Sequence, residues 1–158
     1  MVRFWTILFG RTRVGNCSLG SDMVRCHGDY SYWVVDKHPQ ALKPDEAAFW
    51  RAPEQAVETI AQADVVIITG SALVEGGLND LLAAAGRARA VVLAGPTASP
   101  WPPPFFERGV HVLGGIRILD QPKLLQVVSE GGSGYFFEKE AEKICLVRGS
   151  QALEASES

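Results

Sequence analysis

The sequence has no apolar run that approaches the roughly 18 residues needed to cross a bilayer as a helix. Its N-terminal apolar stretch covers only residues 4–9, charged residues follow at once, and no small-residue cleavage site appears. We therefore expect neither a membrane role nor a secretory signal. Residues 4–9 are better explained as a first strand.

An excess of positive charge is also missing, since 15 Lys and Arg stand against 18 Asp and Glu, for a formal net charge of -3. Such a chain has no basic field to attract nucleic acid or an anionic membrane, so neither is an expected partner. Cysteine is scarce: Cys17, Cys26 and Cys145 are odd in number and irregularly spaced. This argues against a disulfide framework and favours reduced thiols, so we expect a cytoplasmic protein.

Several motifs that would name an activity are absent. The sequence has no P-loop, nucleophile elbow or H-E-x-x-H motif, and Gly10 and Gly15 lack the spacing of the dinucleotide fingerprint. Cys17, Cys26 and His27 match no closed zinc pattern. Whether the protein is an enzyme is left open by these residues.

Four short segments are continuously apolar and rich in β-branched or aromatic residues: 4–9, 32–36, 64–70 and 90–95. Continuous apolarity is typical of strands buried on both faces, so these segments predict parallel strands inside an α/β fold. Residues 110–119 supply a fifth strand, and 143–147 fit an edge strand.

Candidate crossover helices lie between these strands, in 44–62, 78–88 and 121–131. Pro53 must begin a helix, Asp120 is a suitable N-cap, and Gly131 can end the last helix. The pattern predicts a Rossmann-like, open, mainly parallel sheet of five or six strands with helices on both faces. We expect one domain over residues 1–148 and a flexible tail over 149–158, and glycines interrupt the helix expected within 10–31.

Open parallel sheets bind ligands at the carboxyl ends of their strands. Polar and small residues gather there, and we expect them to form a ligand site: Asp36, Thr69, Gly70, Ser71, Glu75, Gly95, Pro96, Thr97 and Gly114. Gly70 would allow a positive-φ turn, while the hydroxyl groups of Thr69 and Ser71 would face a polar or anionic group. Two other interpretations stay open: Thr69 and Ser71 cap the next helix, and Asp36 merely begins a turn.

Two more features bear on this site. The proline-rich segment 96–106 either walls a pocket or covers the open end of the core. His38 and Glu75 are the candidate metal donors, with a divalent transition metal as the cofactor they would hold. An exposed turn histidine is the alternative for His38.

Motifs along residues 32–137 resemble the Rossmann-like C-terminal domain of the putative heavy-metal chelation family. The family's "ITGT-L-N-T" junction, "GPSTP" loop, "G-D-L-G" strand and helix ending in "EGG" are similar, in order, to residues 68–77, 95–100, 109–115 and 129–132. The segment "VVDKHP" (34–39) resembles the family's acid followed by "NP" at the second strand.

This resemblance implies a Rossmann-like fold with a site that an enolase-like N-terminal domain covers. The chain has no room for that domain, so we expect either a stand-alone form that borrows a partner or a truncated one. Glu75 stands where the family usually has Asn, which places a negative charge at the expected site.

Three functions remain in competition. The first is a small cytosolic protein that binds a metal ion, or a metal-bearing or anionic small molecule, at the carboxyl edge of the sheet. The second is a nucleotide- or S-adenosylmethionine-dependent enzyme in which Asp36 holds a ribose. The third is an accessory subunit that completes its site with an enolase-like partner domain or another copy of itself.

Overall fold

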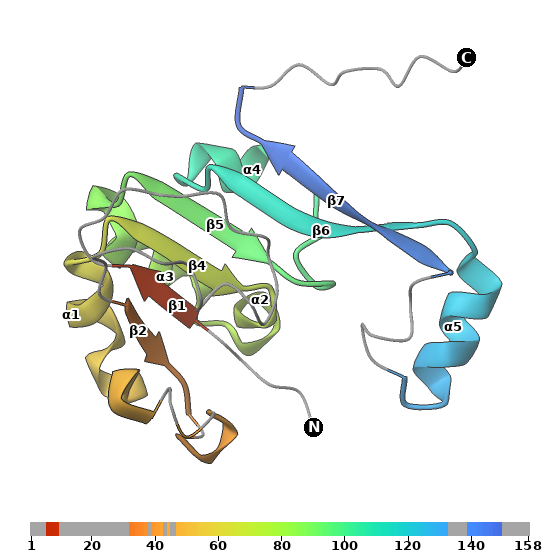
Figure 1. Ribbon diagram of the computed structural model, residues 1–158. Coiled ribbons are helices and arrows are strands. Elements are labelled where there is room, and N and C mark those ends of the chain that lie inside the picture. The colour runs from red at the N-terminus through yellow and green to blue at the C-terminus, as the bar shows by residue number, and fades with distance from the viewer. Residues whose placement is uncertain are drawn as a thin grey trace.

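The computed structural model describes residues 6–9, 32–37, 39–42, 44, 47–132 and 139–149. Its strands form one seven-stranded sheet with the order β3-β2-β1-β4-β5-β6-β7 (Figure 1). The strands are β1 (Thr6–Phe9), β2 (Tyr32–Val35), β3 (Trp50–Arg51), β4 (Val65–Thr69), β5 (Ala90–Ala94), β6 (Val112–Ile118) and β7 (Ala141–Val147).

The sheet is mainly parallel, which confirms the predicted α/β fold class. β4, β5 and β6 run parallel to one another, and β2 runs parallel to β3. β1 differs from the prediction, because it runs antiparallel to both β2 and β4. An apolar run indicates that a strand is buried but carries no information about its direction.

The edges of the sheet also refine the prediction. Strand β7 lies at one edge, as expected for residues 143–147, and it runs antiparallel to β6. Strand β3 forms the other edge inside a segment that we expected to be helical. With only two residues, β3 is too short to produce a recognisable pattern.

The α-helices among the described residues are short. They are α1 (Ala56–Ala61), α2 (Ser71–Glu75), α3 (Leu78–Ala84), α4 (Pro103–Glu107) and α5 (Gln121–Ser129), and 3₁₀ turns cover Pro39–Ala41, Ala47–Phe49, Pro53–Gln55 and Ala85–Arg87. Pro53 begins one of these turns, as its missing N–H group requires. None of these helices is long and apolar enough to cross a bilayer.

The core lies on one face of the sheet, where α1 and α3 pack against each other. Along β4 and β5 the side chains alternate, so that Val66, Ile68 and Leu93 are fully buried while their neighbours are half-buried. Ile60 of α1 and Leu82 of α3 complete this layer. This packing of α1 and α3 against the sheet fixes the positions of the strands and of their carboxyl ends.

Helix α5 lies apart from this core, at the end of the long β6–β7 pair (Figure 1). Its predicted N-cap is confirmed, because Asp120 Oδ1 accepts a hydrogen bond from the Lys123 backbone N–H at 3.1 Å. Gly131, with a φ of 81°, follows the helix as predicted. The expectations for residues 10–31 and for the tail after Gly149 lie outside the described residues, and the single domain over 1–148 stays a prediction.

Candidate functional site

The carboxyl ends of β2, β4 and β5 lie along one edge of the sheet. Strands β4 and β5 are parallel, and β2 has the same direction because both β2 and β4 run antiparallel to β1. The structure therefore places the predicted residues that follow these strands at a common edge, whereas His38 lies outside the described residues. Gly114 belongs to β6 and lies beside the end of β5, where its carbonyl accepts the Gly95 N–H at 2.8 Å.

Gly70 lies where the loops after β4 and β5 meet, and its backbone conformation differs from the one that we predicted. Its φ is -58°, so the prediction of a positive-φ turn is wrong. A Cβ atom at Gly70 would lie 2.5 Å from the Ala98 nitrogen and 2.6 Å from Thr97 Oγ1. Glycine is required because the β5 loop approaches the backbone closely, and this contact brings the hydroxyl group of Thr97 next to the β4–α2 junction.

The left-handed position lies in the neighbouring loop, at Gly95 with a φ of 126°. Ser99 then anchors this loop, because its hydroxyl group donates to Pro96 O at 3.1 Å and accepts the Ile116 N–H at 2.8 Å. A Cβ atom at Gly115 would clash with Ser99 Oγ. The loop 95–99 is therefore held between β4 and β6, and it presents the exposed side chain of Thr97 at the edge of the sheet.

Thr69 and Ser71 form a local network at the start of α2. The Ser71 N–H donates to Thr69 Oγ1 at 3.3 Å, and the two hydroxyl oxygens lie 3.4 Å apart. Thr69 thus accepts the first N–H group of α2, although the N-cap residue is Gly70 and no side-chain N-cap hydrogen bond is present there. Both side chains are half-buried, and a hydroxyl group has one donor and two acceptor positions, so these two contacts do not use all of them.

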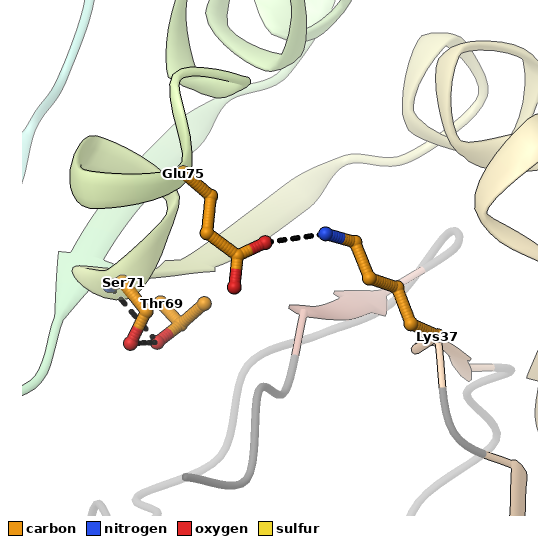
Figure 2. A network of polar contacts seen from close by, with 4 residues as sticks. All are labelled: Lys37, Thr69, Ser71 and Glu75. Carbon is orange, nitrogen blue, oxygen red and sulfur yellow. Dashed lines mark hydrogen bonds and ion pairs between the residues drawn. The ribbon is translucent and has the colours of Figure 1, made fainter.

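Glu75 makes an ion pair that the sequence did not suggest. Lys37 Nζ lies 2.5 Å from Glu75 Oε2, and Figure 2 shows the two side chains pointing toward each other from the β2 loop and from α2. Their side chains are 60% and 34% exposed, respectively. The ammonium group balances the charge of Glu75 and adds a cation to the edge that holds the three hydroxyl groups.

Asp36 lies deeper than a ribose-binding acid should. Only 4% of its surface is exposed, and it is the only polar or charged residue in the buried class among the described part of the chain. Its backbone carbonyl accepts the Trp50 Nε1–H group at 2.9 Å, which ties the end of β2 to β3. This burial favours a role in fixing the strand end over direct contact with a ligand.

The proline-rich segment divides between the two roles that the sequence left open. Phe105 and Phe106 of α4 pack against the core, whereas Trp101 is 74% exposed. Trp101 borders a groove of about 350 Å³ whose other wall includes Ile144 and Leu146. One half of the segment therefore covers the core, and the other half forms the wall of an apolar groove.

The donors at the strand ends do not fit a closed transition-metal site. Within the described ranges, no three His, Cys, Asp or Glu side chains gather closely enough to hold an ion. Glu75 is paired with Lys37, and the remaining donors are hydroxyl groups, which are weak ligands for soft metals. This chemistry suits an oxygen-rich or anionic molecule better than a bare heavy metal.

Taken together, the sheet, its order and the polar strand ends define an α/β protein of the Rossmann-like class. A family model described as "Putative heavy-metal chelation" matches residues 12–147, so the chain belongs to this family. No curated protein matches the sequence.

Two solved structures of this family are similar in fold, and both proteins are described as having unknown function. The protein from Pyrococcus horikoshii is 23% identical with a TM-score of 0.61, and the match covers 73% of this chain and 46% of that one. The protein from Desulfitobacterium hafniense is 24% identical with a TM-score of 0.57, and the match covers 63% of this chain and 40% of that one. The chain thus matches less than half the length of either relative.

Proposed function

We propose that this protein binds a small oxygen-rich or anionic molecule, with or without a metal ion, at the carboxyl edge of its sheet. The observation that carries the proposal is the direct contact between the β4 and β5 loops at Gly70. This contact supports the proposal because it brings the loop that carries Thr97 beside the junction that carries Thr69 and Ser71. Lys37, which follows β2 at the same edge, is the cation that we expect an anion to contact, in place of part of its ion pair with Glu75.

The family description supports a metal-bearing ligand, while the described side chains support the anionic part of such a ligand. A metal held by an organic or oxyanion carrier would satisfy both. The carrier would contact the hydroxyl groups and Lys37, and it would supply the donors that the described residues lack. A metal bound to an anionic carrier would therefore agree with both the family description and the donor groups of the described residues.

A thermal-shift panel tests the proposal. The probes are phosphate, citrate, AMP, S-adenosylmethionine, NAD, Zn²⁺ and Ni²⁺, with the metals offered alone and with citrate. We expect an anionic probe, or citrate with a metal, to raise the melting temperature, and Thr97→Val to reduce that shift. Thr59→Val on α1 is the control, because within the described part of the chain its hydroxyl group donates to the Gln55 carbonyl of the same helical turn. Stabilisation by bare metal alone, or an equal response in both variants, would contradict the proposal.

A second candidate function is that of an accessory chain whose site a partner domain covers. It is favoured by the exposure of the site, since Lys37 is 60% exposed and Thr97 lies on the surface. If none of the probes raises the melting temperature unless a partner domain is added, this second function replaces the first.

A further inference from the structure

A small cavity lies between α2, α3 and α4, and none of the described residues that form the candidate site at the strand ends lines it. Its volume is about 220 Å³, and an apolar cavity of about 150 Å³ is already large enough to hold a benzene molecule. Five of the side chains that line it are apolar: Leu73, Leu78, Leu82, Pro104 and Phe105. The cavity therefore has room for a compact apolar group with one polar substituent.

The apolar wall of this cavity is part of the core. Leu78 and Leu82 lie one turn apart on α3, and each is only 8% exposed. Phe105 packs against the same core, and its carbonyl accepts the N–H groups of Arg108 at 3.1 Å and of Val110 at 3.0 Å. These contacts fix the wall before any ligand arrives, as is usual for sites that bind small molecules.

Two polar side chains meet at the cavity. Arg108 follows α4, Asn79 belongs to the first turn of α3, and the Arg108 Nη1 group donates a hydrogen bond to Asn79 Oδ1. A guanidinium group has five N–H donors, and the nitrogen of an amide side chain has two. Within the described part of the chain, this bond uses one donor of Arg108 and none of Asn79, so N–H groups of both residues remain for a ligand.

Arg108 carries a positive charge that no carboxylate among the described residues balances in an ion pair. The ion pairs of this part of the chain involve Lys37, Arg89, Arg117 and Lys123 as the cations. A flat guanidinium group matches the two oxygen atoms of a carboxylate, and such charge-assisted pairs are among the stronger hydrogen bonds in proteins. Charge complementarity therefore favours a carboxylate beside the apolar wall.

We propose that this cavity binds a small monocarboxylate with a compact apolar body, of the size of benzoate or hexanoate. The apolar body occupies the space beside Leu78, Leu82 and Phe105, while Arg108 and Asn79 hold the carboxylate. This site goes beyond the proposed function, which concerns the polar strand ends. Phosphate and citrate, which suit the strand ends, would place charged oxygen atoms against the apolar wall and bind here poorly.

Isothermal titration calorimetry with a chain series tests the apolar part of the proposal. Acetate, butyrate and hexanoate carry the same carboxylate but differ in apolar surface. We expect the dissociation constant to fall about fourfold for each added CH₂ group, because the cavity buries it. Hexanamide, which has the same chain without the charge, should bind about tenfold more weakly than hexanoate. Equal affinity for acetate and hexanoate, or for hexanoate and hexanamide, would overturn the proposal.

Arg108→Gln tests the polar end of the cavity. The substitution removes the charge that holds the carboxylate, so we expect the dissociation constant of hexanoate to rise about tenfold or more. Arg87→Gln is the matched control, because Arg87 is exposed and is not among the residues that line the cavity. An unchanged affinity in Arg108→Gln, or an equal loss in both variants, would contradict the assignment of Arg108.

Filling the cavity tests its location. Leu73 is 37% exposed on the α2 wall, so Leu73→Trp places an indole group at the cavity without removing a core side chain. We expect this variant to lose hexanoate binding, whereas Val74→Trp, at a 76% exposed position that does not line the cavity, should keep it. Melting curves establish that each variant is folded. Full binding to folded Leu73→Trp, or no binding of any carboxylate to wild type, would overturn the proposal.

Discussion

At the residue scale, the sequence identified the important glycine but not the reason for it. Gly70 follows a buried strand, where positive φ is the usual explanation, and the actual cause is a loop that begins 25 residues later and presses against it. Lys37 was missed for a similar reason, because its partner Glu75 is 38 residues away. Contacts of this kind depend on the tertiary fold, and no local pattern reports them.

Gly70→Ala tests the close approach. The new Cβ atom would lie 2.5 Å from the Ala98 nitrogen, and backbone atoms on both sides would have to move. We expect a loss of about 1–3 kcal/mol in the free energy of unfolding, measured by chemical denaturation. Gly86→Ala is the control, since nothing lies within 4 Å of the position of its Cβ atom. Equal free energies of unfolding for the two variants would show that the loop 95–99 can move away from residue 70 without a loss of stability, and would contradict this prediction.

At the element scale, composition predicted where strands occur, and the cap residues predicted where α5 begins and ends. Strand direction was not predictable, as β1 shows, because apolar residues look the same in both directions. Strand β3 has only two residues, so it is too short for a periodic pattern to predict it. Helix boundaries that depend on a named capping contact, such as that of Asp120, were the most accessible from the sequence alone.

The cap of α5 has a defined pH dependence. Hydrogen bonds from the Lys123 side chain and backbone lower the pKa of Asp120 below its ordinary value of 3.8. When folding lowers the pKa of a carboxylate, its stabilising contribution is complete at pH values above the pKa of the unfolded state. This contribution is lost as the pH falls through the lower pKa of the folded state. We expect faster amide exchange in α5 of Asp120→Ala than of wild type at neutral pH.

This difference between Asp120→Ala and wild type should shrink as the pH falls through the lowered pKa of Asp120, because the carboxylate then becomes protonated. Lys123→Met should produce a smaller change, because the backbone N–H of residue 123 still reaches the cap. A difference between wild type and Asp120→Ala that does not change with pH would assign the effect to helix propensity instead.

At the scale of the whole molecule, the sequence predicted a mainly parallel α/β sheet and the edge at which its polar strand ends meet. It did not predict how the molecule balances charge there. The Lys37–Glu75 pair changes the expected character of the site, because the acid no longer favours a cation by itself. The burial of Asp36 likewise weakens the nucleotide-dependent enzyme as an interpretation.

The most direct test of binding at the carboxyl edge is a ¹H–¹⁵N correlation spectrum titrated with the anionic probe that stabilises the protein most. We expect the perturbed amides to cluster in residues 36–37, 69–75 and 95–99, and to lose their response in Lys37→Gln. Perturbations confined to the α1–α3 side or to the β7 edge, or no perturbation by any probe, would contradict the account.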